Sequence, residues 1–480
     1  MLFTEPTFLF LFLPVLLALY FVTRVHARYA NWLLLVASVI FYAKGGGAFT
    51  WLMLGSIAFN YVMAIGVDRA LRVSRQRARS VLATAITANL VVLAWFKYAN
   101  FLADNASRLA ITFGEHPIAL SHVVLPIGIS FYTFHAISYV VDVYRGHATA
   151  QKSPVHAALY LLLFPQLIAG PIIRYKDIAS QLARRVVTLD DFVYGVRRFI
   201  LGLGKKVLIA NIVAVPADGI FALPASQLIG PYAWAGIVCY TLQIYFDFSG
   251  YSDMAIGLGR MFGFTFPENF RWPYIADSVQ EFWRRWHMSL SSWFRDYLYV
   301  PLGGNRVAAW KTYRNLVTVF FLCGLWHGAS WNFVVWGLFH GAFLVVERLG
   351  LGTVLARLPR SVRHVYLLVV VMVGWVFFRA PNLPSALTYL QTLFGFGHGE
   401  MPALRLSWYL TREVRIAMLA GIIGAMPLVP TLRIWTDRVA HQWQRVAAET
   451  TGTVALLAIF LAALLQVAAR TYNPFIYFRF

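Results

Sequence analysis

Long apolar segments recur along the whole chain and are separated by short polar or basic stretches. A helix of about 20 predominantly apolar residues crosses the hydrocarbon core of a bilayer. The candidate spans are residues 7–23, 29–43, 48–66, 80–97, 123–141, 156–173, 198–222, 229–246, 313–348, 364–379, 416–432 and 452–469. Two of them, 29–43 and 123–141, are short or interrupted, and 313–348 is too long for one simple crossing. The pattern predicts an all-α, multi-pass helical bundle of about eleven spans with further re-entrant or interfacial helices.

This pattern contains no linker, low-complexity segment or clear internal repeat, so we expect a single membrane domain over residues 1–480. The first apolar segment is TFLFLFLPVLLALYFV (7–22). No Lys or Arg precedes it, and no small-residue cleavage site follows it. A signal peptide has both features. The segment is therefore predicted to be the first transmembrane helix.

Composition supports the membrane assignment. Of the 480 residues, 59% are apolar and 13% are charged, whereas soluble domains average about 45–50% and about 25%. The two cysteines, Cys239 and Cys323, both lie in apolar runs. Such a pair indicates neither a disulfide framework nor a cysteine-rich metal site. We therefore predict that the chain has no metal site.

The formal charge of +21 is concentrated in short loops between apolar segments. The loop DRALRVSRQRAR (68–79) carries five arginines and one acidic residue. Loops rich in Lys and Arg mark the cytoplasmic side of a membrane protein. Three candidate spans precede this loop, so Met1 is expected on the outer face, and Arg24 and Arg28 then fall on the cytoplasmic side. The charge is thus interpreted as membrane topology and contact with anionic lipid headgroups, and no nucleic-acid partner is expected.

The stretch 264–312 is rich in aromatic residues and arginines and has no apolar run of span length. Such residues gather at membrane interfaces. A helical wheel at about 100° per residue places seven side chains of 283–297 within an arc of about 120°. These are Trp283, Trp286, His287, Leu290, Trp293, Phe294 and Tyr297. The remaining arc holds Arg284, Arg285, Arg295, Asp296, Ser289, Ser291 and Ser292. The pattern predicts one amphipathic interfacial helix with His287 on its apolar face.

A second histidine, His327, lies in the apolar run GLWHGASWNF (324–333). An ionisable group inside a membrane segment is costly and is a functional candidate by default. One interpretation is a structural imidazole that is hydrogen-bonded to a backbone carbonyl. The other is a general base, because burial keeps an imidazole neutral and able to accept a proton from a hydroxyl.

The other candidates carry weaker signals. Cys323 lies four residues before His327, so a Cys–His nucleophilic pair is conceivable, although buried cysteines are also ordinary packing residues. His340 is interpreted as packing, and Asp247 and Asp253 are interpreted as structural hydrogen-bonding groups rather than catalytic ones. The chain has no Walker-type glycine loop, no Gly-x-Ser-x-Gly elbow and no His-Glu-x-x-His motif. Nothing in it resembles an ATP-driven pump or a serine hydrolase.

Several segments together resemble one family, the membrane-bound O-acyltransferases. They are LPIGISFYTFHAISYVVDVYRG (125–146), FPQLIAGPIIRY (164–175), YFDFSGYSDMAIGLGRMFGFTFPENF (245–270), EFWRRWHMSLSSWFRDYLYVPLGGNR (281–306), GLWHGASWNFVVWGLFHG (324–341) and NPFIYFRF (473–480). The resemblance covers nearly the whole chain and is close to the bacterial branch that acts in alginate O-acetylation. The two histidine motifs match the family pattern without departure.

The resemblance implies a ring-like helical bundle, thin at its centre, with a tunnel in which acyl donor and acceptor meet. His327 matches the buried catalytic histidine of the family, and His287 matches its second histidine, on the cytoplasmic side. Acetyl-CoA is the implied donor substrate, and no tightly bound cofactor is expected. Arg284, Arg285 and Arg295 are candidates to bind the donor phosphates, since guanidinium groups suit phosphate. Binding of lipid headgroups is their alternative role.

The implied function is acetyl transfer across the inner membrane to an exported polysaccharide, with alginate as the expected final acceptor. A periplasmic acetyltransferase or acetyl-carrier protein is the implied partner. The same chemistry on peptidoglycan, cellulose or another exopolysaccharide stays open, as does D-alanylation of teichoic acid. A non-catalytic transporter or scaffold is the alternative in another class. Transporters commonly show paired repeats with broken spans in both halves, and no such pairing is visible here.

Overall fold

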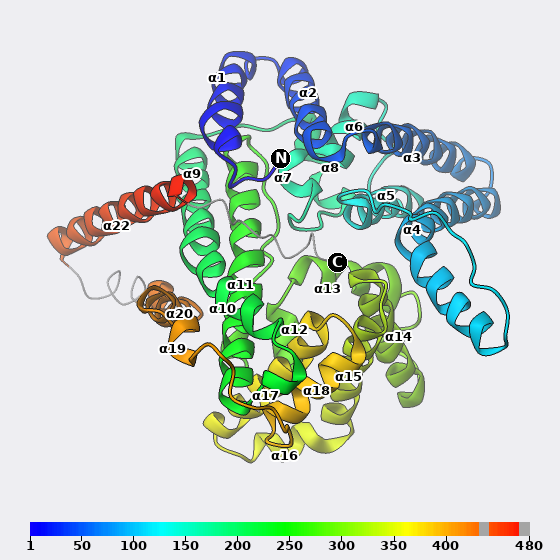
Figure 1. Cartoon of the computed structure of the whole chain (residues 1–480). Coiled ribbons are helices and arrows are strands. Elements are labelled where there is room, and N and C mark those ends of the chain that lie inside the picture. Colours follow the sequence, from blue (N-terminus) through cyan, green and yellow to red (C-terminus); the bar gives the residue numbers. More distant parts are fainter. Residues whose placement is uncertain (432–440, 470–480) are drawn as a thin grey trace. The chain divides into compact units, whose positions relative to one another are not determined.

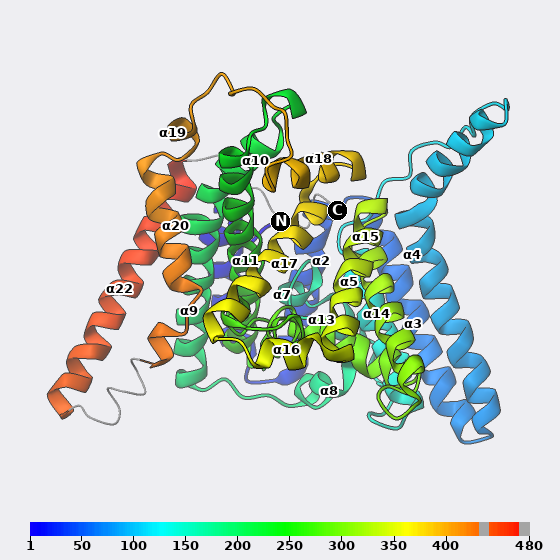
Figure 2. The same cartoon turned by 90° about the horizontal axis from the view of Figure 1, so that it is seen from below.

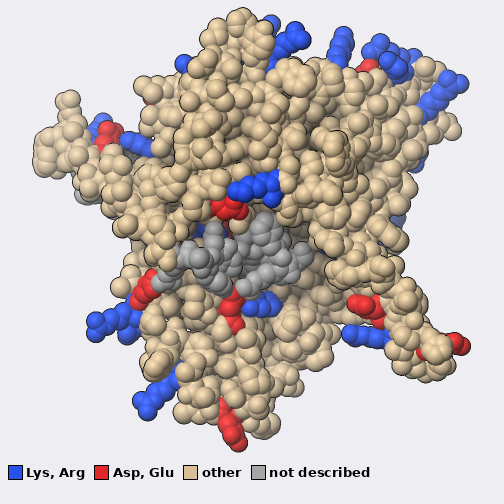
Figure 3. All heavy atoms as spheres, turned by 45° about the horizontal axis from the view of Figure 1, so that its top comes forward, with Lys and Arg blue, Asp and Glu red and all other residues tan. Residues whose placement is uncertain are grey.

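A computed structural model describes residues 1–431 and 441–469 of the chain. These residues form helices joined by loops, and no strand occurs among them (Figure 1). Six of the described helices are long and apolar enough to cross a membrane. On the face shown in Figure 3, charged side chains stand in scattered groups between broad uncharged areas. The chain is therefore a multi-pass, all-α membrane protein, as predicted, whereas the count of about eleven spans stays a prediction. The motif 473–480 and the last residue of the span 416–432 lie outside the described residues.

By its internal contacts the chain divides into two compact units. Unit 1 contains residues 1–196 and 255–267, and unit 2 contains residues 197–254 and 268–480. Both units are discontinuous because α9 (Leu189–Gly204) and α11 (Gly230–Met261) each contribute residues to both. That residues 1–480 form a single membrane domain stays a prediction.

Unit 1 holds most of the early candidate spans. Its helices are η1 (Phe8–Phe12), α1 (Leu13–Thr23), α2 (Ala27–Gly46), α3 (Phe49–Leu71), α4 (Arg75–Thr112), α5 (Ile129–Tyr144), α6 (Pro154–Leu162), α7 (Phe164–Leu167) and α8 (Tyr175–Ala183). Within this unit α3 and α4 lie side by side, and the longer α4 extends beyond the start of α3 (Figure 2). The basic loop after α3 ends at Ser74, whose hydroxyl accepts a hydrogen bond from the backbone N–H of Arg77 and so caps α4.

The span expected at 156–173 is not one helix, and this expectation was wrong. The chain forms α6, the single turn α7 and then an irregular stretch that leads to α8. Pro165 and Pro171 explain the breaks, because proline has no N–H to donate and clashes with the preceding turn. Side chains satisfy two of the backbone N–H groups in this stretch. Phe164 donates to Ser38 Oγ at 3.1 Å, and Ile173 donates to Nε2 of His135 at 3.2 Å.

Unit 2 begins within α9 and contains the remaining helices. They are η2 (Lys205–Ala210), α10 (Asn211–Phe221), η3 (Ala225–Gln227), η4 (Pro273–Ile275), α12 (Val279–Arg285), α13 (Met288–Phe294), η5 (Arg295–Tyr299), α14 (Ala309–His327), α15 (Trp331–Val346), η6 (Glu347–Leu351), α16 (Gly352–Ala356), α17 (Arg360–Arg379), α18 (Leu383–Leu393), α19 (Leu406–Tyr409), α20 (Arg412–Gly424) and α22 (Gln442–Ala469). The segment Lys205–Ala210 is a π-helical turn between α9 and α10.

Ion pairs, one of them buried, join this π-helical turn and α9 to α11 within unit 2. Nζ of Lys206 lies 2.5 Å from Oδ1 of Asp247, and the two side chains are only 3% and 2% exposed. Asp253 contacts both Lys205, at 2.7 Å, and Arg198, at 2.8 Å. The two aspartates therefore neutralise cations between packed helices, in agreement with the structural role that the sequence favoured.

The long apolar run 313–348 is a helical hairpin of α14 and α15, which run side by side in Figures 1 and 2. Gly324 and Gly337 let the two backbones approach closely. A Cβ at Gly324 would lie 2.2 Å from the carbonyl oxygen of Phe333, and one at Gly337 would lie 2.3 Å from that of Phe320. Small residues at such crossings are common between membrane helices. The expectation that this run is too long for one crossing is confirmed.

The single amphipathic helix predicted over 283–297 was also wrong. The chain forms α12, a break at Trp286 and His287, α13 and the π-helical turn η5. His287 adopts the left-handed conformation, with φ of 44°, which ends the helical hydrogen bonding. A preceding segment bonds to the backbone at the break. Met288 donates to the carbonyl of Asn269 at 2.9 Å, and Arg271 donates to that of Arg285 at 3.0 Å.

Candidate functional site

His327 is the last residue of α14, and its side chain is enclosed by aromatic rings of unit 2. It is 7% exposed. The imidazole centroid lies 4.9 Å from the ring of Trp326, 5.0 Å from Trp336 and 5.1 Å from Phe378. Gly328 follows in an extended conformation, and a Cβ there would lie 2.1 Å from the Phe333 ring. The histidine thus lies at a helix end within an apolar run rather than in the middle of a continuous helix.

His287 is buried, and the amide of Asn269 fixes one of its ring nitrogens. It is 1% exposed, and its Nδ1 lies 3.1 Å from Oδ1 of Asn269. The same oxygen accepts hydrogen bonds from the backbone N–H of Ser289 at 3.2 Å and from its hydroxyl at 2.8 Å. Because a backbone N–H can only donate, that atom is the amide oxygen. Nδ1 of His287 must therefore carry the proton.

The other ring nitrogen of His287, Nε2, is consequently the lone-pair atom of the neutral imidazole. It has no hydrogen-bond partner among the described residues. Burial lowers the pKa of His287 to about 3, so the ring stays neutral near pH 7. The ring of Phe248 stands perpendicular to it at 4.6 Å. A neutral ring of fixed tautomer can accept a hydrogen bond or a proton at Nε2, and the lowered pKa makes it a weaker base than a free imidazole.

The ring of Trp326 lies near both histidines. Its ring centroid is 4.9 Å from that of His327 and 6.1 Å from that of His287. Trp336 extends the cluster to His340, at 5.2 Å. His340 is fully buried against Trp283, in line with the packing role expected for it. Unit 2 thus brings together the two histidines that the sequence singled out.

The three candidate donor-binding arginines do not share one helical face, because the break at His287 separates them. Arg284 is exposed on α12. Arg285 pairs with Glu281 at 2.5 Å, and Arg295 pairs with Asp296 at 2.8 Å. A carboxylate therefore already contacts two of the three guanidinium groups. Their assignment to donor phosphates stays a prediction.

Two further features bear on the chemistry of the site. Cys323 is a free, buried thiol one helical turn before His327. It therefore stays a candidate nucleophile for a covalent Cys–His mechanism. Within residues 1–431 and 441–469, no three His, Cys, Asp or Glu side chains cluster as metal ligands would.

Sequence reasoning missed Asn269, which orients His287. Its only signal was an amide side chain beside an aromatic residue in PENF (267–270), and nothing in that pattern links it to a residue 18 positions later. Ser289 was placed on the polar arc, but it is buried against the same amide.

Comparison with known proteins places the chain in a class. Residues 76–387 match the membrane-bound O-acyltransferase family, MBOAT, and this stretch includes both histidines. The chain belongs to this family, so it is an O-acyltransferase of the membrane. The resemblance found in the sequence motifs is thereby confirmed.

Individual relatives match from end to end. The chain is 42% identical to "Probable alginate O-acetylase AlgI" of Azotobacter vinelandii and 43% identical to the protein of that name in Pseudomonas putida, over 100% of both chains in each case. It is 33% identical to "Peptidoglycan O-acetyltransferase" of Helicobacter pylori, over 100% of this chain and 98% of the relative. The likeness therefore covers at least 98% of each of these relatives, well beyond the two histidine motifs.

Proposed function

We propose that the chain transfers acetyl groups for the O-acetylation of an exported polysaccharide, and that alginate is the final acceptor. The relatives named as alginate O-acetylases, at 39–43% identity over the whole chain, support this acceptor. The relative named for peptidoglycan is less similar, at 33%. Peptidoglycan is accordingly the second candidate acceptor.

The observation that carries the proposed chemistry is that two buried imidazoles, His287 and His327, both lie near the ring of Trp326, and that the tautomer of His287 is fixed. In this scheme His327 is the general base. Its imidazole accepts the proton of the acceptor hydroxyl while the hydroxyl oxygen attacks the acetyl carbonyl carbon. The new C–O bond forms, the thioester C–S bond breaks, and the departing thiolate takes up a proton to give the coenzyme A thiol. His287 assists at the donor end through Nε2.

The direction of transfer is part of the proposal. Acetyl-CoA reaches the protein from the cytoplasm, and a periplasmic acetyltransferase or acetyl-carrier protein presents the acceptor hydroxyl on the outer side of the inner membrane. The basic segment 68–79, formed by the end of α3, the turn 72–74 and the start of α4, supports this orientation, because Lys- and Arg-rich connections stay on the cytoplasmic side. Met1 is then on the periplasmic face.

The orientation predicts how single cysteines react in intact cells. In a background without Cys239 and Cys323, Gln76→Cys should resist a membrane-impermeant thiol reagent, since the loop faces the cytoplasm. Glu115→Cys, in the exposed segment after α4, should react and serves as the matched control. Labelling of the first position and protection of the second would reverse the topology.

The acceptor is tested by deleting the gene in its host and restoring it on a plasmid. The acetyl content of purified alginate and of purified peptidoglycan is then measured in each strain. Loss and recovery on alginate alone supports the proposal, and loss confined to peptidoglycan replaces alginate with the second acceptor. Sealed vesicles of known orientation, given labelled acetyl-CoA on one face, test the direction. Equal use of donor from the outer face would contradict transfer across the membrane.

A further inference from the structure

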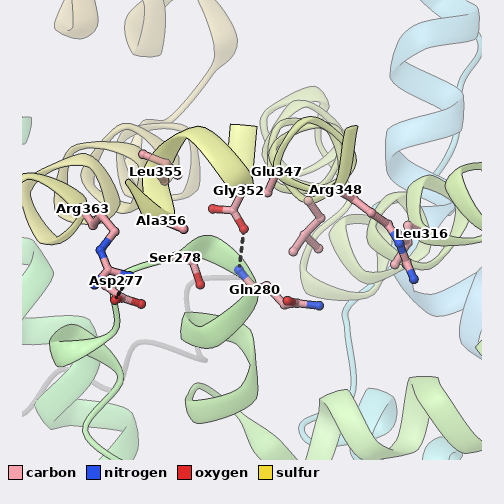
Figure 4. A pocket seen from close by; sticks show the side chains of 11 residues that line it. Asp277, Ser278, Gln280, Leu316, Glu347, Arg348, Gly352, Leu355, Ala356 and Arg363 are labelled. Atoms are coloured by element: carbon pink, nitrogen blue, oxygen red, sulfur yellow. Dashed lines mark hydrogen bonds and ion pairs between the residues drawn. The ribbon is translucent and has the colours of Figure 1, made fainter. Parts of the chain in front are cut away.

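A pocket of about 300 Å³ opens in unit 2 (Figure 4), and neither His287 nor His327 lines it. Its walls come from the end of α15, the turn η6, helix α16, the start of α17, Leu316 of α14 and the residues that lead into α12. Gly350, with φ of 148°, makes the turn that redirects the chain from α15 to α16. The proposed reaction leaves this cavity without a role.

The carboxylates in the pocket are already engaged. Glu347 accepts hydrogen bonds from the backbone N–H groups of Val279 at 2.7 Å and Gln280 at 3.1 Å, and from the hydroxyl of Tyr366 at 3.2 Å. Asp277 pairs with Arg363 at 2.7 Å. These contacts hold the walls together, and they limit the repulsion that an incoming anion would meet.

Guanidinium donors remain available. Arg348 is exposed on η6, and no ion pair or hydrogen bond ties it to another described residue. Nε of Arg363 is buried without a hydrogen-bond partner within the described part of the chain. Figure 4 shows the Asp277–Arg363 pair on one side of the pocket and Arg348 on the other. Such groups suit a phosphate, which accepts several charge-assisted hydrogen bonds.

Part of the lining is apolar, beside the polar side chains of Ser278 and Gln280. Leu316, Leu344 and Leu355 contribute hydrocarbon surface beside the guanidinium groups. The pocket therefore combines donors for an anion with a surface for an alkyl chain, which suits an amphiphile rather than a fully polar anion.

The pocket lies where the chain is expected to meet the membrane surface. The pocket lies at the end of the candidate span Trp331–Ala356 and the start of the candidate span Arg360–Arg379, where lipid headgroups are expected. Four arginines fall in this connection: Arg348, Arg357, Arg360 and Arg363. By the positive-inside rule, this end of the two helices faces the cytoplasm.

We infer that this pocket binds the phosphate headgroup of a membrane phospholipid, with the guanidinium groups of Arg348 and Arg363 as donors and the three leucines against the acyl chain. The inference does not depend on the proposed acceptor. Coenzyme A also carries phosphate groups, but the apolar wall and the location at the span ends favour the lipid.

The test compares Arg348→Gln with the matched control Arg357→Gln, which removes an exposed arginine of the same connection that does not line the pocket. Each purified protein is examined by native mass spectrometry after exchange into detergent. The expected result is that the wild type and Arg357→Gln retain one tightly bound phospholipid and that Arg348→Gln loses it. Equal retention by both variants would overturn the inference.

Two measurements on the wild type do not depend on the folding of a variant. A photoreactive phospholipid should crosslink to peptides from residues 344–363, and added coenzyme A should leave this crosslink unchanged. Absence of crosslinking there would count against the site. Displacement of the lipid by coenzyme A, together with a raised KM for acetyl-CoA in Arg348→Gln, would reassign the pocket to the donor.

Discussion

Unit 1 and unit 2 each bury a histidine completely, but the two imidazoles are left with opposite capacities. Nε2 of His135 in unit 1 accepts the N–H of Ile173, so Nδ1 must carry the proton and no lone pair remains. In unit 2, Nδ1 of His287 donates to Asn269, and the lone pair of Nε2 remains. These two histidines are equally buried, so burial does not separate them. They differ in whether a neighbouring N–H occupies the lone pair of Nε2.

The largest expected effect comes from removing the histidines of unit 2. His327→Ala and His287→Ala should each lower acetyl transfer by about 10²–10⁴-fold, the usual contribution of general acid–base catalysis. The amount of protein in the membrane should stay near that of the wild type. Acetyl transfer per mole of purified protein measures the effect.

His287→Asn provides a control, since asparagine tolerates the left-handed conformation that His287 adopts. It should be as inactive as His287→Ala while keeping the fold. Activity in this variant would mean that His287 is needed for its backbone shape and not for its lone pair.

The second prediction concerns the histidine of unit 1. His135→Ala leaves the buried N–H of Ile173 without its partner, which costs about 1–3 kcal/mol of stability. The thermal midpoint and the yield of folded protein should fall, whereas transfer per folded molecule should stay close to that of the wild type. A loss per folded molecule as large as that of His287→Ala would break the contrast between the two units.

A smaller effect is expected from Asn269→Asp, which tests whether this residue positions His287. A carboxylate beside Nδ1 stabilises the protonated ring, so the pKa of His287 rises from its lowered value. His287 accepts a proton only when neutral, so activity should be lost as pH falls through the raised pKa. The acid limb of the pH–rate profile should therefore move to higher pH. An unchanged profile alongside a lower rate would indicate a purely structural role for Asn269.

The smallest effect is expected from Cys323→Ser. Its thiol lies one turn from His327, but general-base transfer does not need it, so the variant should retain most of the activity. The measurement is the same transfer assay. An inactive serine variant beside an active His327→Ala would replace the general-base scheme with a covalent cysteine.

Apolar periodicity predicted most of the helices because span length and burial follow from local composition. It failed where a distant side chain competes with the helix. At His287 the competing residue is Asn269, which local pattern could not connect to it. The break in 156–173 was visible as Pro165 and Pro171, and greater weight on those prolines would have found it. The helical wheel still placed His287 on the buried side, and the structure confirms that its side chain is buried.

The ion pairs of Arg285 and Arg295 could in part have been predicted from the sequence. Glu281 precedes Arg285 by four residues, a spacing that brings side chains together on a helix. Asp296 directly follows Arg295. In contrast, the surroundings of His327 depend on rings from α15 and α17, whose packing no local pattern specifies.

The buried pair of Lys206 and Asp247 has a consequence for how the protein is made. Lys206 emerges from the ribosome before Asp247, near the middle of a helix that must enter the lipid. A lone lysine at that depth costs about 2.5–3.5 kcal/mol during insertion. The helix 189–221 therefore gains its full stability in the bilayer only when α11 arrives. The order of synthesis thus couples the insertion of these two helices.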